Sequence, residues 1–430
     1  MEESLRMRQW QRITLALMIC GYAGYYVCRS NLSIVTPILI KEFGGVGINK
    51  QAIGDMVALA TLFYAFGKFV GGSLADKLGG KRVFLVGMGG SILCTIFFAV
   101  SGTIPLFTLA WSLNRLVQSM GWAGMVRISS RWYSYTTYGA VMGAVSLSFL
   151  FGDFLSRQFL SLLISWNMGW RAVFYSAAAT LAVLFIVTLF MLKESPKDIG
   201  EPEPLANPES LFGEAGATET EATTADILKT VLRSPIFWLV CVLSIGVTLV
   251  RETFNTWTPQ YLTEVIHMAK DSAGRTSSYF PLFGGISVLL CGYLSDRLGR
   301  AGRAAIIFVG LVLTIPALLV FAFGKFGDSV GLATLALGTV AFMLLGPYSF
   351  LAGAIALDFG GKKGSATVSG WVDGMGYLGG IASGKVIGDL AQKQGWSAAF
   401  LFLTAVAVLT AIAAGVYWRH QHKEVRDTAH

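Results

Sequence analysis

Long apolar stretches, separated by short polar segments, run through almost the whole chain. The stretches at 172–192 and 304–323 contain no charged residue. Each is close to the roughly 20 residues that a helix needs to cross a hydrocarbon layer of ~30 Å. Because the stretches are too long for barrel strands and lack a period of two, the pattern predicts membrane-spanning helices.

The pattern predicts an all-α membrane protein with twelve transmembrane helices in two sets of six. The expected spans are 12–40, 51–75, 83–101, 104–129, 137–165, 170–192, 236–266, 273–295, 303–323, 329–357, 364–391 and 396–418. The segment at 194–233, between the two sets, is rich in Pro, Glu, Ala and Thr, which is typical of a linker. We therefore expect a six-helix bundle at 1–193, a cytoplasmic linker at 194–233, and a second bundle with a cytoplasmic tail at 234–430.

The two halves of the chain repeat each other. Gly-Ser-Leu-Ala-Asp-Lys-Leu-Gly at 72–79 corresponds to Gly-Tyr-Leu-Ser-Asp-Arg-Leu-Gly at 292–299. Gly-Trp-Arg-Ala-Val-Phe at 169–174 corresponds to Gly-Trp-Ser-Ala-Ala-Phe at 395–400. Repeats of the same orientation predict two pseudo-symmetric bundles, with a substrate site between them near the middle of the bilayer.

Composition and charge support a membrane protein and give its orientation. Hydrophobic residues make up 54% of the chain and charged residues 13%, and the net charge is +8. The basic residues are spread over short loops, so the charge predicts cytoplasmic termini rather than binding of nucleic acid. The five cysteines lie in apolar runs and the four histidines lie in a loop or the tail. We therefore expect no metal site, no cofactor and no enzymatic activity.

Several segments carry a family resemblance. Twelve spans, with Gly-Ser-Leu-Ala-Asp-Lys-Leu-Gly-Gly-Lys-Arg at 72–82, resemble the major facilitator superfamily. The segments at 21–29, 64–69, 251–262 and 362–380 resemble the organophosphate:inorganic phosphate antiporter family, which includes glycerol-3-phosphate, hexose-phosphate and glucose-6-phosphate transporters. The resemblance implies the major facilitator fold and exchange of a phosphate ester for inorganic phosphate.

Two arginines, Arg29 and Arg251, lie near the middle of predicted spans. A guanidinium at the centre of a span costs at least about 2.5 to 3.5 kcal/mol, so it is rarely kept there without a partner or a task. Two guanidinium forks can bind a phosphoryl group in bidentate fashion, and the resemblance implies the same role. Lys68, inside the second span, could add electrostatic attraction for the same phosphoryl group. The competing interpretation is that each cation only pairs with a buried carboxylate.

Aromatic side chains near these spans are further candidates for substrate contact, although packing is the alternative for each. They are Tyr25, Tyr26, Tyr64, Trp122, Tyr261, Tyr348 and Trp371. Three carboxylates are candidates for coupling or selectivity: Asp153, Glu252 and Asp373. Glycerol-phosphate carriers have a histidine in the fifth span, whereas 146–153 here has none and supplies Asp153. Such an acid could hold an ammonium group, carry a proton, or balance Lys68 or Arg157.

Asp76, Arg131 and Asp296 are predicted gating residues. Asp76 and Asp296 stand where a span ends and a basic loop begins, and Arg131 is a candidate partner for the first. Ion pairs that form only while the cytoplasmic side of the transporter is closed would bias the equilibrium between outward-facing and inward-facing states. The alternative is a loop cap without a switching role.

Taken together, the sequence predicts a secondary active transporter, a monomer in a bacterial inner membrane, whose partners are a small anionic phosphate ester, inorganic phosphate and the lipid bilayer. Two other functions stay open. One is a proton-coupled symporter of an organic carboxylate, with Asp153 or Glu252 taking the proton. The other is a membrane sensor of phosphate esters that resembles a transporter.

Overall fold

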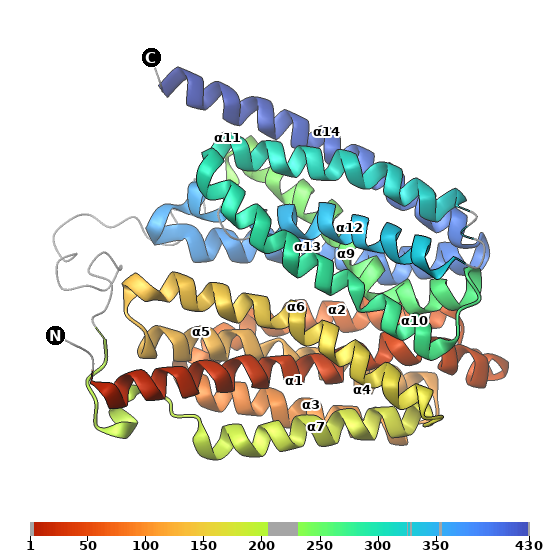
Figure 1. The fold of residues 1–430 in the computed structure, drawn as a ribbon, viewed down its shortest axis with the longest axis horizontal. Coiled ribbons are helices and arrows are strands. Elements are labelled where there is room, and N and C mark those ends of the chain that lie inside the picture. Colours follow the sequence, from red (N-terminus) through yellow and green to blue (C-terminus); the bar gives the residue numbers. More distant parts are fainter. Residues whose placement is uncertain (1–3, 205–230, 325, 327–328, 352–354, 429–430) are drawn as a thin grey trace. The chain divides into compact units, whose positions relative to one another are not determined.

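The computed structural model describes residues 4–204, 231–324, 326, 329–351 and 355–428, and every regular element among them is a helix (Figure 1). In the first half of the chain the elements are α1 Leu5–Phe43, η1 Gly44–Val46, α2 Lys50–Leu78, α3 Gly80–Val100, α4 Ile104–Gln118, α5 Met120–Trp132, α6 Tyr135–Ser165, α7 Trp170–Met191 and η2 Pro196–Ile199. In the second half they are α9 Pro235–Val265, α10 Lys270–Ser277, α11 Tyr279–Phe323, α12 Val330–Phe350, α13 Ala356–Lys393 and α14 Trp396–Thr428.

Eight stretches in the described helices are long and apolar enough to cross a membrane by length and composition alone. Long helices also cover the other predicted spans, but α1, α2 and α13 carry more polar and charged side chains, and the span at 104–129 is broken into α4 and α5. On α7, Val183, Ile186 and Phe190 form an exposed apolar stripe, as expected of a helix surface that faces lipid. The predicted all-helical membrane fold is confirmed.

Two helix boundaries differ from the prediction. The span predicted at 104–129 is interrupted at Ser119, between α4 and α5. Residues 295–303, predicted as a loop, fall within the bounds of α11, Tyr279–Phe323, which folds back on itself in Figure 1, so Lys270–Leu294 and Gly302–Phe323 are separate candidate spans. The preceding interruption, between α10 and α11, lies just before Pro281, which favours the first turn of a helix.

The described residues form two compact units. Unit 1 consists of 4–48, 59–204 and 270–278, and unit 2 consists of 49–58, 231–269 and 279–428. Thus the start of α2 belongs to unit 2, and α10 belongs to unit 1. The predicted boundaries of the two bundles stay a prediction.

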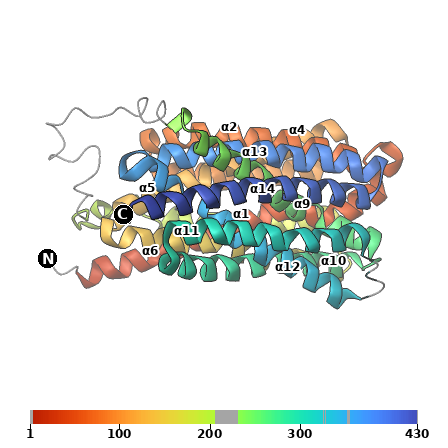
Figure 2. The same cartoon turned by 90° about the horizontal axis from the view of Figure 1, so that it is seen from above.

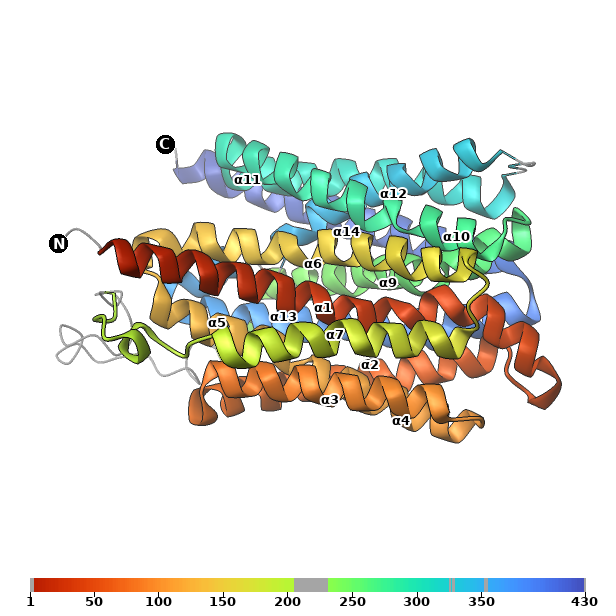
Figure 3. The same cartoon turned by 60° about the horizontal axis from the view of Figure 1, so that its bottom comes forward.

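In unit 1, α1 packs between α6 and α7, and α3 packs against α4, α5 and α7 (Figure 3). An aromatic cluster stabilises these contacts. The rings of Phe98 and Phe174 stack with centroids 4.5 Å apart, and Trp170 packs edge-on against both. Trp170 and Phe174 come from the predicted repeat, so the repeat marks a core position at the start of α7.

In unit 2, α9 packs against α13 and α14, and α11 packs against α12 and α14 (Figure 2). The matching cluster lies at the start of α14. Phe400 stacks on Phe321 with ring centroids 5.2 Å apart, and Tyr261 packs edge-on against Trp396 at 5.6 Å. Trp396 and Phe400 are the repeat counterparts of Trp170 and Phe174, so each unit uses the repeated motif in the same way.

Candidate functional site

Three cations of unit 1 gather around the ring of Tyr64, and together with that ring we call them the Tyr64 cluster. The guanidinium of Arg29 lies 4.8 Å from the ring centroid, the guanidinium of Arg115 lies 4.5 Å away, and the ammonium of Lys68 lies 5.4 Å away. Arg29 also donates a hydrogen bond of 3.3 Å to the Tyr64 hydroxyl. A ring face attracts cations through its quadrupole, so one buried tyrosine holds positive charge contributed by α1, α2 and α4.

The tyrosines of α1 divide into two kinds. Tyr26 lies 5.2 Å from the guanidinium of Arg29 and stacks on Phe149. Tyr25 is 1% exposed, and its hydroxyl donates a hydrogen bond of 2.6 Å to the carbonyl of Phe84. Tyr26 is therefore part of the surroundings of Arg29, whereas Tyr25 packs in the core of unit 1.

Arg251 of unit 2 has a different environment. Its Nη2 lies 2.6 Å from the Oε1 of Glu252, and its guanidinium lies 4.4 Å from the ring centroid of Tyr348. The buried Nε–H of Arg251 has no hydrogen-bond partner among the described residues. Asp373, from α13, interacts electrostatically with Arg251. We call Arg251, Glu252, Asp373 and Tyr348 the Arg251 cluster.

The remaining aromatic candidates lie in varied positions. The hydroxyl of Tyr261 donates to the carbonyl of Phe321 at 2.9 Å within the core of unit 2. Trp122 packs against Tyr22, with centroids 6.0 Å apart, and Trp371 is 36% exposed. The structure does not bring these three side chains into either cluster.

Asp153 is buried in unit 1 beside a cation on its own helix. Both of its carboxylate oxygens lie 3.1 Å from the Nε of Arg157, one turn later on α6. Ser30, the residue after Arg29, donates a hydrogen bond to the same carboxylate. Arg157 in turn donates to Ser277 of α10 at 3.1 Å. The pair therefore ties α1, α6 and α10 together.

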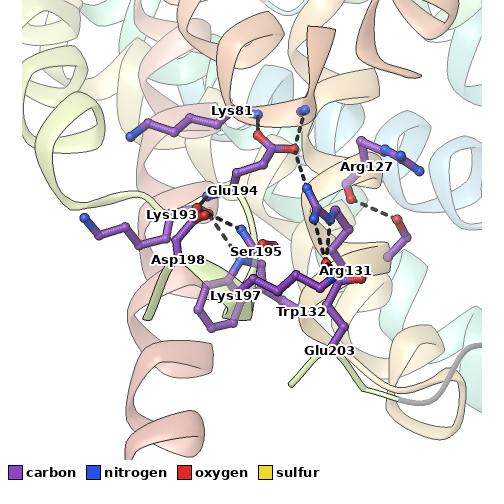
Figure 4. A network of polar contacts seen from close by, with 12 residues as sticks. Lys81, Arg127, Arg131, Trp132, Lys193, Glu194, Ser195, Lys197, Asp198 and Glu203 are labelled. Atoms are coloured by element: carbon purple, nitrogen blue, oxygen red, sulfur yellow. Dashed lines mark hydrogen bonds and ion pairs between the residues drawn. The ribbon is translucent and has the colours of Figure 1, made fainter. Parts of the chain in front are cut away.

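Arg131 forms ion pairs with acids that follow α7. It donates to Glu203 through Nε at 3.1 Å and Nη2 at 2.6 Å, and its Nη1 lies 3.6 Å from Glu194 (Figure 4). Glu194 also accepts hydrogen bonds from the backbone N–H groups of Gly80 and Lys81 at 2.8 and 2.7 Å. It thereby satisfies free donors at the start of α3. The side chains of Asp76 and Asp296 lie outside the described part of the structure.

The start of α1 joins the same region. Tyr133, directly after α5, donates a hydrogen bond of 2.5 Å to the carbonyl of Gln11. Burial raises the pKa of the Tyr133 hydroxyl above its ordinary value, so the hydroxyl stays protonated and keeps donating. The end of α5 is therefore fixed to α1 as well as to the residues that follow α7.

Residues 18–384 match the Major Facilitator Superfamily. The chain belongs to this superfamily. Its members are transporters, so the prediction that the protein is an integral membrane transporter and no enzyme is confirmed. A bacterial homologue of the human lysosomal transporter Spinster, solved in an inward-facing conformation, has the same fold, with a TM-score of 0.74 and 16% identity over 97% of this chain and 98% of that one.

Curated relatives from the superfamily cover nearly the whole chain. A "Probable hexose phosphate transport protein" of Chlamydia muridarum is 28% identical over 98% of this chain and 94% of that protein. A "Glycerol-3-phosphate transporter" of Bacillus subtilis is 26% identical over 97% and 95%. The "Membrane sensor protein UhpC" of Escherichia coli is 27% identical over 96% and 93%. The predicted resemblance to the organophosphate:phosphate antiporters is thus confirmed.

Three residues that were not predicted from the sequence join the candidate site or the gating region in the structure: Arg115, Glu194 and Glu203. Arg115 lies in the predicted fourth span, so the criterion that selected Arg29, a cation inside a span, would have found it. Glu194 and Glu203 lie at the start of the predicted linker, where an acid gives no comparable signal.

A second set of ion pairs belongs to unit 2. Lys385 of α13 lies 2.7 Å from Asp55 of α2 and 3.4 Å from Asp389. Two glycines let the helices approach closely there, because a Cβ at Gly54 would meet the carbonyl of Gly384. None of these contacts could be predicted from the sequence.

Proposed function

We propose that this superfamily member is a secondary active transporter that exchanges an organophosphate, of the sugar phosphate or glycerol phosphate class, for inorganic phosphate by alternating access. The observation that carries the proposal is the Tyr64 cluster, with three cations around one buried ring. A phosphoryl group brings two negative charges and several acceptor oxygens, which suit guanidinium forks and an ammonium. The names of the Chlamydia and Bacillus relatives support the same substrate class.

In this mechanism, Arg29 and Lys68 bind the phosphoryl group, and Arg251 is the second arginine that contacts it during the cycle. Tyr26 and Tyr348, which lie over the two arginines, contact the rest of the ligand. The cations of the Tyr64 cluster repel one another at low dielectric. An anion relieves that repulsion, so we expect the carrier to return only with phosphate or another phosphate ester bound. This requirement makes the transport an exchange.

We further propose that both termini are cytoplasmic, because the loops predicted on the same side as the termini carry most of the basic residues, and that the protein works as a monomer in a bacterial cell membrane. Arg131, with Asp76 and Asp296, is then a cytoplasmic gating residue. The pairs that Arg131 forms with Glu194 and Glu203 would stabilise one state of the gate.

Exchange in liposomes tests the proposal. The purified protein is reconstituted in liposomes loaded with inorganic phosphate, and uptake of labelled phosphate is followed with unlabelled glycerol 3-phosphate, glucose 6-phosphate or gluconate outside. We expect phosphate-for-phosphate exchange that the two esters inhibit and gluconate does not. Uptake of the carboxylate driven by a proton gradient, with no phosphate exchange, would contradict the proposal and favour a proton-coupled symporter.

A sensor is the second candidate, because the Escherichia coli relative is named a membrane sensor. A sensor would bind phosphate esters while moving little of them. Thermal stabilisation of the purified protein by an ester, together with absent counterflow in liposomes, would support that function.

A further inference from the structure

Arg251 and Glu252 are consecutive residues that nevertheless pair. Neighbouring residues of a helix point about 100° apart, so their side chains do not ordinarily meet. In α9 the Nη2 of Arg251 lies 2.6 Å from the Oε1 of Glu252, and the two side chains are 14% and 15% exposed. A charge-assisted hydrogen bond of this length between mostly buried groups is a strong one. Glu252 therefore occupies one edge of the guanidinium that is proposed to bind phosphate.

The other neighbours of Arg251 add negative charge. Asp373 acts on the guanidinium electrostatically from α13, so the Arg251 cluster holds one cation and two carboxylates. The Nε–H of Arg251 is buried and lacks a hydrogen-bond partner within the described residues. Buried donors are nearly always paired, so this edge of the fork suits an oxygen atom of a ligand.

A ligand that carries only negative charge fits this cluster poorly. Its phosphoryl oxygens could bond to the Nε edge of Arg251, but they would lie close to Glu252 and Asp373, and like charges repel strongly where water is scarce. A ligand that brings a cation removes the conflict, because its ammonium can bind the carboxylates. The Tyr348 ring, 4.4 Å from Arg251, gives an ammonium a further attractive face.

We propose that Glu252, assisted by Asp373, selects organophosphates that also carry an ammonium group, such as aminoalkyl phosphates or aminophosphonates. The inference rests on the proposed function and narrows its substrate class. The carboxylates of the Arg251 cluster then distinguish zwitterionic ligands from plain dianions.

Two ligands that differ only in the ammonium test the proposal: 2-aminoethyl phosphate and ethyl phosphate. Their dissociation constants are measured by thermal stabilisation of the purified protein in detergent, which requires no transport. A charge-assisted bond adds roughly 1.5–3 kcal/mol, so we expect the amino compound to bind at least about tenfold more tightly. In Glu252→Gln we expect this preference to disappear because ethyl phosphate gains affinity and 2-aminoethyl phosphate loses it.

Matched variants make the result specific. Glu42→Gln changes a half-exposed glutamate that pairs with Arg171 in unit 1, and the preference should persist in it. Asp373→Asn should reduce the preference without abolishing it, and it provides a second test if Glu252→Gln is unstable.

Equal binding of the two ligands by the wild-type protein would overturn the inference, and so would an unchanged preference in Glu252→Gln. The same two ligands as competitors in the liposome exchange assay separate this inference from the proposed function. A preference in binding without phosphate exchange refutes the exchanger and keeps the selectivity, whereas exchange inhibited equally by both ligands keeps the exchanger and refutes the selectivity.

Discussion

Arg29 of unit 1 and Arg251 of unit 2 both lie against the ring of a tyrosine, at 4.8 and 4.4 Å, but their other neighbours have opposite charge. Arg29 shares its tyrosine with Lys68 and Arg115. Arg251 pairs with Glu252 and lies near Asp373. Two arginines, one in the first long helix of each half of the chain, thus belong to a cationic cluster in one case and a predominantly acidic cluster in the other.

The difference shows that pseudo-symmetry of the backbone does not extend to the electrostatics. In the proposed function, the cations of unit 1 would attract the phosphoryl group, and the acids of unit 2 would decide which ligands are accepted. Unit 1 also has a buried carboxylate, Asp153, but it is held by Arg157 and Ser30. The contrast between the units therefore depends on Asp153 staying bound to Arg157 and Ser30, and substitutions in the two units can test it.

The largest expected effect follows from breaking the Asp153–Arg157 pair. Asp153→Asn leaves the Arg157 guanidinium buried without its counter-charge, which typically destabilises a protein by about 3–5 kcal/mol. We expect a clear drop in the thermal unfolding temperature in detergent, and recovery of most of it in the double variant Asp153→Asn/Arg157→Gln.

The chain offers a matched control for that experiment. Asp271 and Arg275 of α10 have the same spacing along a helix but are more exposed, at 22% and 41%. Exposed pairs contribute at most about 1 kcal/mol, so Asp271→Asn should have little effect. A change in ligand selectivity of Asp153→Asn with unchanged stability would instead place its carboxylate in the substrate site.

Replacing the arginine of the cationic cluster is expected to have the next largest effect. Arg29→Lys keeps the charge but loses the planar fork, so phosphoryl oxygens lose bidentate hydrogen bonds. With roughly 1.5–3 kcal/mol for each charge-assisted bond, exchange should fall by about 100-fold or more. The measurement is labelled phosphate exchange at saturating and subsaturating phosphate.

Arg171→Lys is the control for Arg29→Lys, because Arg171 is half-exposed and pairs with Glu42. It should exchange phosphate at the wild-type rate. Exchange near the wild-type level in Arg29→Lys would refute a phosphate-binding role for Arg29.

The sequence was most informative about elements with long apolar patterns and about charges inside them. Hydropathy predicted the helices, because crossing a bilayer demands length and apolar composition together. It did not predict the break at Ser119, between α4 and α5, because such a break depends on local hydrogen bonding rather than on hydropathy. Arg29, Lys68 and Arg251 could be singled out because cations inside spans are rare. All three also lie in the segments that resemble the antiporter family.

Partners of those charges could not be predicted from the sequence. Glu252 follows Arg251 directly, and helix geometry alone turns the two side chains apart, so their pairing depends on rotamers chosen by the packing around α9. Arg131 pairs with Glu194 and Glu203, more than sixty residues later, which requires knowledge of how the segment after α7 folds back. In both cases the missing information is tertiary.

Arg115 is the third cation at the Tyr64 ring, and its removal should have a smaller effect than that of Arg29. It is 7% exposed and lies 4.5 Å from the ring centroid. Arg115→Gln lowers the positive potential without removing the fork of Arg29, so we expect the apparent affinity for phosphate to fall by roughly three- to tenfold. Competition of unlabelled phosphate in the exchange assay measures this, and an unchanged affinity would show that Arg115 only packs against Tyr64.

The smallest effect should come from Tyr64→Phe, which separates the ring from its hydroxyl. Phenylalanine retains the ring face toward the three cations but loses the hydrogen bond of 3.3 Å from Arg29. Since an ordinary hydrogen bond contributes about 0.5–1.5 kcal/mol, we expect a two- to tenfold loss of exchange, whereas Tyr64→Ala should lose more because it removes the ring itself. Tyr348→Phe makes the same substitution in the ring that lies against Arg251. If phenylalanine and alanine at position 64 behave alike, the hydroxyl rather than the ring organises the cluster, and the two units then differ in how they hold their arginines as well as in charge.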